Sequence, residues 1–124
     1  MKKLYVCGSF RFAREIEELE NRLKRENIEC QISKRMDSRG ILGCLKKIDD
    51  ADVVYVVNPG GYVGKSVSVD IGYACARNKP IYVMHSVDDP PVMGLVNAVL
   101  SPKSLIEVIK KGSPSRMRGE KRAR

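Results

Sequence analysis

The sequence predicts a three-layer α/β fold, in which a parallel β-sheet of about five strands carries helices on both faces. Two observations lead to this prediction. Apolar segments of strand length alternate along the chain with longer segments of helical periodicity. Residues 52–58 form an almost continuous run of β-branched side chains, which is typical of a strand buried on both faces of a parallel sheet. Right-handed strand–helix–strand units account for the alternation.

The first part of the chain is predicted to form a strand, a helix, a second strand and a second helix. Residues 3–8 make the first strand, which ends in a glycine, and residues 28–33 alternate as a short second strand does. Residues 11–26 form an amphipathic helix whose apolar face consists of Phe12, Ile16, Leu19 and Leu23. A second helix is expected from Arg39 to about Ile48.

The second part continues the alternation. The strand 52–58 is followed by a glycine-rich loop at 59–64, a helix at 65–78 and a buried strand at 80–85. Asp89-Pro90-Pro91 then breaks the chain.

The last predicted elements are a short strand between Leu95 and Leu100 and a helix at 102–111. Ser101 is the N-cap of that helix and Pro102 is its first residue. The whole order of elements resembles flavodoxin-like or Rossmann-like folds.

The charge distribution indicates one domain, residues 1–111, followed by a basic flexible tail, residues 112–124. A chain of 124 residues fits a single domain with a core of its own. The formal net charge is +8, and the tail holds five basic side chains against one acidic side chain, which is half of that excess. The tail has no aromatic residue to stack on bases, so we expect no more than a weak attraction to nucleic acid there.

Composition excludes several classes of protein. No apolar run approaches the roughly 18–20 residues that a membrane span needs. Arg11 and Arg14 end the first apolar stretch too early for a secretory signal, so we expect a cytoplasmic protein. The single histidine, His85, has no partner in sequence and is interpreted as structural. The cysteines at positions 7, 30, 44 and 75 form no CxxC motif, so we expect buried thiols, with neither a structural metal nor a cofactor.

Ligands of an open parallel sheet bind beyond the carboxyl ends of its strands. Three loops meet that description, at residues 8–11, 58–65 and 85–93. The first two lead into predicted helices, whose free N-terminal N–H groups favour a phosphate.

Two familiar phosphate-binding motifs fail here by one residue. Gly64-Lys65-Ser66 ends like a Walker A loop, but the first glycine of that motif falls on Pro59, and no convincing Walker B aspartate follows. The C-x5-R loop of small tyrosine phosphatases needs arginine where Ala13 stands, and Arg14 lies one residue too far. We therefore reject a tyrosine phosphatase and keep a P-loop NTPase only as a minor alternative.

Four segments together carry a more specific resemblance. Residues 4–11 read Leu-Tyr-Val-Cys-Gly-Ser-Phe-Arg, residues 51–54 read Ala-Asp-Val-Val, residues 70–74 read Asp-Ile-Gly-Tyr-Ala, and residues 78–81 read Asn-Lys-Pro-Ile. In order and spacing they resemble segments of the nucleoside 2-deoxyribosyltransferase family. The first two look most like the deoxyribonucleoside 5′-monophosphate N-glycosidases of that family.

The resemblance implies cleavage of an N-glycosidic bond by hydrolysis or transfer. A carboxylate attacks the anomeric carbon as the nucleobase leaves, and water or a second base then accepts the sugar. Carried over by position, Asp70 is the nucleophile, Tyr5 lies beside the sugar, and Asp52 supports both by hydrogen bonding.

The same resemblance implies a phosphate site and an oligomer. Gly8, Ser9 and Arg11 would hold a 5′-phosphate. Gly64 takes the place of a serine that precedes the nucleophile in those enzymes, and Ser66 lies nearby. The family further implies a homo-oligomer, a dimer, whose sites are completed across an interface.

The chain also departs from the family pattern. Asp70 is one methylene shorter than the family's glutamate, and Phe12-Ala13 replaces a Gly-Gly pair. Plain structural roles are open to the candidates: Asp70 as an acid near a helix start, Asp52 as a turn acid, Tyr5 as core packing and Ser9 as an N-cap. The alternative function is therefore a nucleotide-binding module that has lost efficient catalysis.

Overall fold

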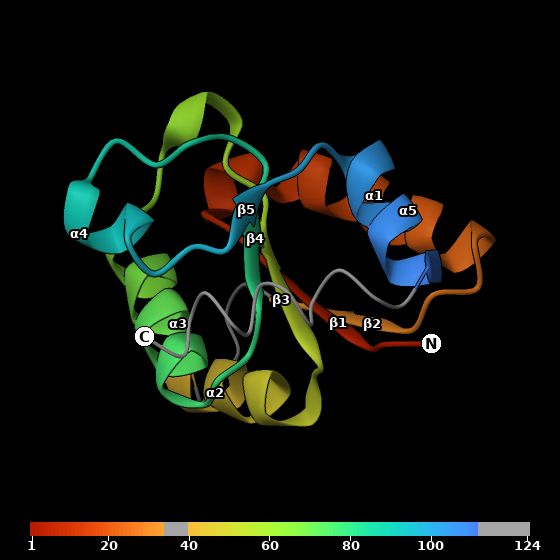
Figure 1. Cartoon of the computed structure of the whole chain (residues 1–124), viewed down its shortest axis with the longest axis horizontal. Helices are drawn as coiled ribbons and strands as arrows, with labels where there is room; N and C mark the ends of the chain where they lie inside the picture. The colour runs from red at the N-terminus through yellow and green to blue at the C-terminus, as the bar shows by residue number, and fades with distance from the viewer. Residues whose placement is uncertain (34–39, 112–124) are drawn as a thin grey trace.

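The computed structural model describes residues 1–33 and 40–111, and it confirms the three-layer α/β fold (Figure 1). One sheet contains five parallel strands in the order β2-β1-β3-β4-β5. The strands are β1 (Leu4–Cys7), β2 (Cys30–Ile32), β3 (Val53–Val56), β4 (Ile81–Val83) and β5 (Ala98–Val99). The predicted tail, residues 112–124, lies outside the described residues.

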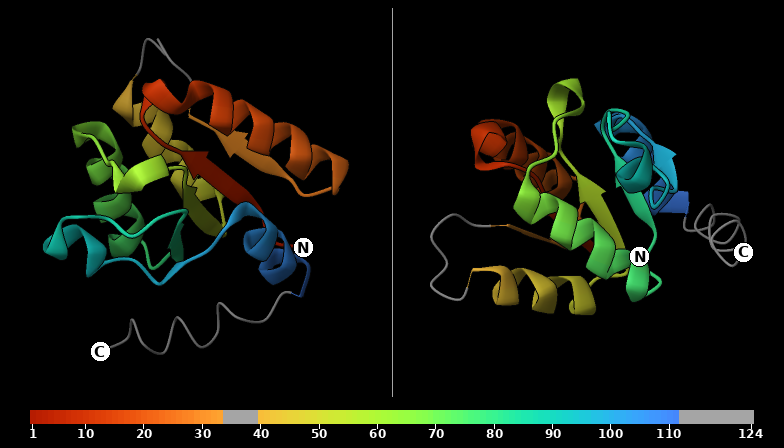
Figure 2. Two further views of the ribbon diagram at one scale, coloured as in Figure 1. Left: turned by 90° about the horizontal axis from the view of Figure 1, so that it is seen from above. Right: turned by 90° about the vertical axis from the view of Figure 1, so that its left-hand side faces the viewer.

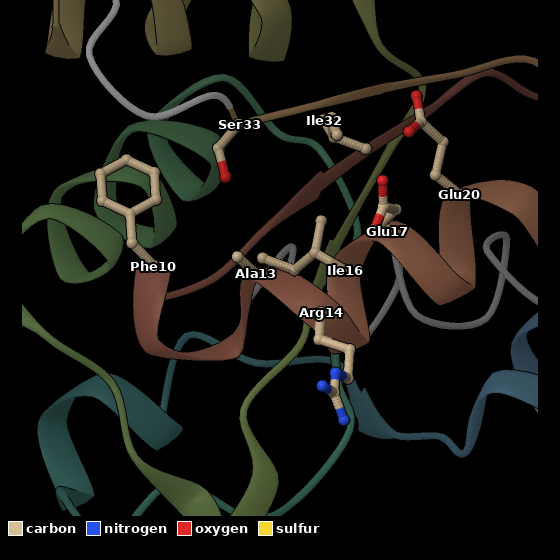
Figure 3. A pocket seen from close by; sticks show the side chains of 8 residues that line it. All are labelled: Phe10, Ala13, Arg14, Ile16, Glu17, Glu20, Ile32 and Ser33. Carbon is tan, nitrogen blue, oxygen red and sulfur yellow. The ribbon is translucent and has the colours of Figure 1, made fainter.

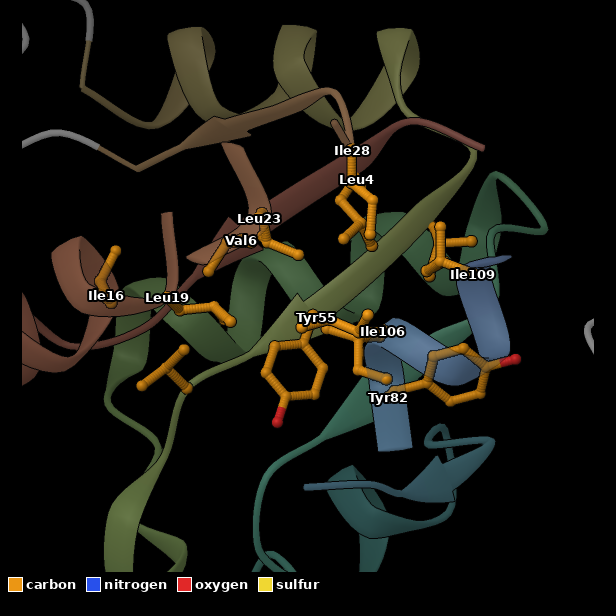
Figure 4. Packing of buried hydrophobic residues seen from close by; sticks show 13 residues of the cluster. Leu4, Val6, Ile16, Leu19, Leu23, Ile28, Tyr55, Tyr82, Ile106 and Ile109 are labelled. Atoms are coloured by element: carbon orange, nitrogen blue, oxygen red, sulfur yellow. The ribbon is translucent and has the colours of Figure 1, made fainter. Parts of the chain in front are cut away.

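Helices cover both faces of the sheet. Figures 1 and 2 show α1 (Ala13–Arg25) and α5 (Pro102–Lys111) on one face, and α2 (Ile41–Asp50) and α3 (Lys65–Ala76) on the other. Side chains alternate between the faces along each strand. Leu4 and Val6 of β1 pack in the layer under α1 and α5, which Figure 4 shows, whereas Tyr5 and Cys7 pack toward α2 and α3.

The bounds of several elements differ from the prediction. The strands are shorter, and a 3₁₀ turn, η1 (Phe10–Phe12), precedes α1 in place of the first turn of the predicted helix 11–26. The predicted helix at 39–48 is α2, which ends two residues later at Asp50, while Arg39 lies outside the described residues. Helix α3 ends at Ala76 rather than at residue 78, because Asn78 adopts a φ of +60° and closes the helix.

The predicted break at residues 89–91 is wrong. These residues begin a short helix, α4 (Pro90–Met93), in which the Asp89 carboxylate accepts a hydrogen bond of 3.4 Å from the Val92 N–H. The same kind of signal is confirmed at α5, where the Ser101 hydroxyl oxygen accepts a bond of 3.1 Å from the Ser104 N–H.

The strand order reverses direction at β1, which lies between β2 and β3. The loops that leave β1 and β3 therefore run to opposite faces of the sheet, toward α1 and α3, and leave a crevice beyond the carboxyl ends of these two strands. The loop after β1 leads into η1, and the loop after β3 contains a second 3₁₀ turn, η2 (Pro59–Gly61).

Within the described ranges, none of the helices is long and apolar enough to cross a membrane. The same residues contain no group of three or more His, Cys, Asp or Glu side chains arranged to hold a metal ion. All four cysteines are free thiols; Cys7 is buried, and the other three are partly buried.

Candidate functional site

A cavity of about 400 Å³ lies beyond the carboxyl ends of β1 and β3. It brings together five of the residues predicted to form the site, two from the first loop and three from the start of α3. Its lining consists of Gly8, Ser9, Phe10, Ser33, Cys44, Tyr62, Gly64, Lys65, Ser66, Val67 and Asp70. The cavity is thus the crevice that the strand order predicts.

Gly8 lets the first loop pass close to β3. A Cβ atom at this position would lie 2.5 Å from the carbonyl oxygen of Val57. The Val57 N–H donates to the carbonyl oxygen of Cys7 at 2.8 Å. This hydrogen bond holds the segment at Gly8 close to the end of β3. Ser9 follows and caps η1, because its hydroxyl oxygen accepts a hydrogen bond from the Arg11 N–H at 3.3 Å. The capping role of Ser9 is confirmed, and the residue also lines the cavity.

Asp70 is a buried carboxyl group that faces the cavity from the second turn of α3. Its side chain is 3% exposed, and Oδ1 has no hydrogen-bond partner among the described residues. Burial raises the pKa of Asp70 to about 7, an effect that the nearby Tyr5 hydroxyl partly offsets. The helix dipole acts mainly on the first turn, so it does not explain an acid at this depth.

Tyr5 and two thiols surround this carboxyl group. The Tyr5 side chain is fully buried, and burial, the Cys7 thiol and then Asp70 raise the pKa of its hydroxyl far above the ordinary value. The hydroxyl lies near Asp70 and Cys44 but has no hydrogen bond of good geometry within residues 1–33 and 40–111. The Tyr5 hydroxyl therefore stays protonated, and its O–H group can donate a hydrogen bond. Burial likewise raises the pKa of the Cys7 thiol.

Arg11 lies beside the cavity rather than among the residues that line it. Its guanidinium carbon sits 3.8 Å from the centre of the Tyr62 ring, and Tyr62 itself lines the cavity. The Phe12 ring meets the same tyrosine edge-on, with centroids 6.2 Å apart at 70°. A Cβ atom at Gly64 would lie 3.3 Å from the Tyr62 hydroxyl, so this ring reaches from the first loop to the start of α3.

The structure does not bring Asp52 to this site. Asp52 directly precedes β3, at the amino end of the strand, and its carboxylate accepts a hydrogen bond of 2.8 Å from the Lys3 N–H. It is exposed at the edge of the sheet opposite the cavity. These contacts fit the turn-acid interpretation and give no support to the role that the resemblance implies.

Asn58 fixes the loop that carries Tyr62. It is fully buried, and its side-chain amide donates to the His85 carbonyl oxygen at 2.8 Å and accepts from the His85 N–H at 2.9 Å. The loop after β3 is thereby fastened to the end of β4. The contact uses only the backbone of His85, which fits the structural interpretation of that residue.

Sequence analysis did not single out Tyr62, Asn58 or Cys44. A helical signal existed for Cys44, because it precedes Ile48 by one turn on the buried face of α2. Tyr62 had no such signal, since its contact with Arg11 joins residues about fifty positions apart.

A second cavity, of about 520 Å³, lies between α1 and β2 and shares Phe10 and Ser33 with the first (Figure 3). Its charged lining residues are Arg14, Glu17 and Glu20, so two acidic side chains that oppose a phosphate face one basic side chain. In Figure 3 the Arg14 side chain points away from Ser33. The first cavity is therefore the better candidate for an anionic ligand.

No protein-family model and no curated protein sequence matches the chain. Solved structures do match. A conserved protein from Enterococcus faecalis V583 aligns with a TM-score of 0.66 and 17% identity, over 90% of this chain and 99% of that one. The CMP N-glycosidase BcmB of Clostridium botulinum aligns with a TM-score of 0.57 and 13% identity, over 89% and 99%.

The NanR protein of Vibrio vulnificus, complexed with ManNAc-6P, aligns with a TM-score of 0.63 and 15% identity, over 98% of this chain and 53% of that one. At these identities the likeness shows a shared fold. An N-glycosidase among these structures agrees with the N-glycosidase part of the resemblance. No sequence comparison supports membership of the deoxyribosyltransferase family.

Proposed function

We propose that this protein cleaves the N-glycosidic bond of a nucleoside or a nucleoside 5′-monophosphate, with Asp70 as the nucleophile. One observation carries the proposal: a buried carboxyl group, whose Oδ1 has no hydrogen-bond partner in the described part of the chain, faces a cavity that two phosphate-compatible loops enclose. The shared fold of a CMP N-glycosidase supports the same class of reaction.

In the proposed reaction the ionised Asp70 carboxylate forms a bond to the anomeric carbon. The carbon–nitrogen bond breaks, and its electron pair leaves with the nucleobase, which gains a proton. Water, or a second base in a transfer reaction, then attacks the same carbon and releases the carboxylate. The protonated Tyr5 hydroxyl lies beside the carboxylate as a hydrogen-bond donor.

We place a 5′-phosphate at the N-terminus of α3. Gly64 gives α3 no side-chain cap, so the N–H groups of its first turn are left for an anion. Lys65, Ser9 and Ser66 also line the cavity and supply side chains that can bind a phosphate. The resemblance further implies that the enzyme acts as a homodimer, which a native mass measurement tests.

The test is to incubate the protein with ribo- and deoxyribonucleosides and their 5′-monophosphates and to follow free base by chromatography. We expect base release from at least one substrate. Asp70→Asn keeps the shape of the side chain but removes the nucleophile, so the rate should fall by about 10³-fold or more. The matched control is Asp50→Asn, at an exposed acid that pairs with Lys46 on α2. Base release that survives in Asp70→Asn would contradict the proposal.

The alternative is a module that binds a nucleotide or sugar phosphate without efficient catalysis. It is favoured by the shorter side chain of Asp70 and by the shared fold of a protein complexed with a phosphorylated sugar. A melting temperature raised by nucleotides, with no free base from any substrate, would select this alternative.

A further inference from the structure

The contact between Arg11 and Tyr62 joins the two loops that enclose the cavity. Arg11 belongs to η1, after β1, and Tyr62 follows η2, after β3. The guanidinium lies 3.8 Å above the ring centre, and the Phe12 ring supports the tyrosine edge-on. Within residues 1–33 and 40–111, Arg11 makes no ion pair. Among these residues, stacking on Tyr62 is the contact that holds its guanidinium in place.

Stacking on a ring differs from an ion pair because it leaves the N–H donors of the guanidinium free. A guanidinium presents its five N–H donors in the plane of the group, whereas a cation–π contact uses the face of that plane. Arg11 is thus fixed in position while its in-plane donors stay available for two oxygens of an oxyanion. An acidic partner would have fixed the side chain but occupied those donors.

The surroundings are those of an anion site. Tyr62 lines the cavity beside Ser9 and Gly64, and Gly64 opens the uncapped N-terminus of α3. A second observation points to a ligand in this cavity: Asp70, 3% exposed, lines it, and its Oδ1 has no hydrogen-bond partner within residues 1–33 and 40–111. Phe12, which replaces a glycine of the monophosphate glycosidases, packs on Tyr62 instead of closing the cavity.

We propose that Tyr62 is the positioning residue that makes this cavity select a phosphorylated ligand, by holding the Arg11 guanidinium at the rim where it meets the phosphate. The ligand class is a sugar 5-phosphate, free or within a nucleotide. The nucleotide part of this statement rests on the proposed function, whereas selection for the phosphate does not depend on catalysis.

The experiment measures dissociation constants for ribose 5-phosphate and ribose by calorimetry, with the full chain and four variants. We expect ribose 5-phosphate to bind more tightly than ribose. Tyr62→Leu should weaken ribose 5-phosphate about three- to tenfold and leave ribose unchanged. Tyr62→Phe keeps the ring and should restore the affinity. Arg11→Lys keeps the charge but not the plane, so it should lose affinity as Tyr62→Leu does.

The matched control is Tyr73→Leu, which removes another tyrosine beside an arginine, Arg77, at 5.9 Å, where the Tyr73 hydroxyl donates to Asp49 of α2. It should change neither constant. Equal weakening of both ligands in Tyr62→Leu, or loss of affinity in Tyr62→Phe, would overturn the proposal.

Base release measured in parallel separates this inference from the proposed function. If Tyr62→Leu loses the preference for ribose 5-phosphate but the wild type releases no base, only the proposed function is wrong. If the wild type releases base but Tyr62→Leu keeps the preference for ribose 5-phosphate, only this inference is wrong.

Discussion

At the scale of single residues, the protonation of Asp70 sets the conditions under which the protein can react. The carboxyl group must be ionised to attack, and its pKa lies near 7 because it is buried. We therefore expect kcat/KM for base release to rise with pH through about 7 and to level off above about 8. A pH–rate profile between pH 5 and 9 measures this. A profile already flat at pH 5 would show that the reacting group is ionised throughout.

The same pKa links Asp70 to stability. The folded protein keeps the proton up to pH of about 7, whereas the unfolded chain loses it near pH 3.9. Ionised Asp70 therefore destabilises the folded protein. This destabilisation grows as pH rises from about 4 to 7 and stays constant at higher pH. Asp70→Asn removes the titration, so this variant should be more stable than the wild type at pH 8 by a few kcal/mol, at about 1.4 kcal/mol per pKa unit.

Urea unfolding of both proteins at pH 4 and pH 8 tests the stability prediction. The difference in unfolding free energy should nearly vanish at pH 4, where the native carboxyl group is protonated. A difference that is the same at both pH values would assign it to packing instead of to charge.

At the scale of elements, the turn η2 is held by backbone contacts that only glycine allows. Gly60 and Gly61 have φ values of +71° and +85°. A Cβ atom at Gly61 would lie 2.5 Å from the Ser86 carbonyl oxygen, whereas one at Gly60 would meet nothing within 4 Å. The two glycines share the backbone conformation and differ in the contact, so they form a matched pair.

Gly60→Ala should cost about 1 kcal/mol for its left-handed conformation. Gly61→Ala should cost roughly 1–3 kcal/mol more, because the backbone must move to relieve the overlap. Since Tyr62 follows directly, Gly61→Ala should also weaken ribose 5-phosphate binding, and Gly60→Ala should not. Unfolding curves and calorimetry measure both effects, and equal costs for the two variants would mean that the Ser86 contact is easily relieved.

Some elements could be predicted from sequence because their signals are local. Helix α5 has the predicted bounds, since a capping serine, a proline and an amphipathic stretch follow one another. Asp89-Pro90 gives the same capping signal for α4, but Pro91 and Gly94 leave so short a helix that the chain reads as broken. The loops at residues 8–11 and 58–65 could be placed beside the ligand site from sequence, because each follows a predicted parallel strand. The stacking of Arg11 on Tyr62 could not, because it depends on how two distant loops meet.

At the scale of the whole molecule, we propose that residues 1–111 form the folded unit. Among residues 1–33 and 40–111, the two hydrophobic layers draw on each part of the chain up to Ile109. A chain that ends at Lys111 should keep the melting temperature of the full chain to within a few degrees and keep its affinity for ribose 5-phosphate. It should lose any weak, salt-sensitive binding to nucleic acid, since half of the net charge leaves with residues 112–124.

Differential scanning calorimetry, together with nucleic-acid binding at two salt concentrations, tests the truncation. A large fall in melting temperature would make the last thirteen residues part of the fold. Unchanged nucleic-acid binding would place the attraction on the folded body instead.

The reversal of strand order at β1 also gives a ligand a mechanical role. Part of the cavity wall, Gly8 to Phe10, comes from the first tenth of the chain, and Tyr62 to Val67 comes from its middle. A molecule seated between them ties together two segments that no covalent bond joins and no shared helix spans. A bound ligand would thus act as a removable cross-link that stabilises the folded state. We expect β1 to separate from β3 only together with loss of the cavity and release of the ligand.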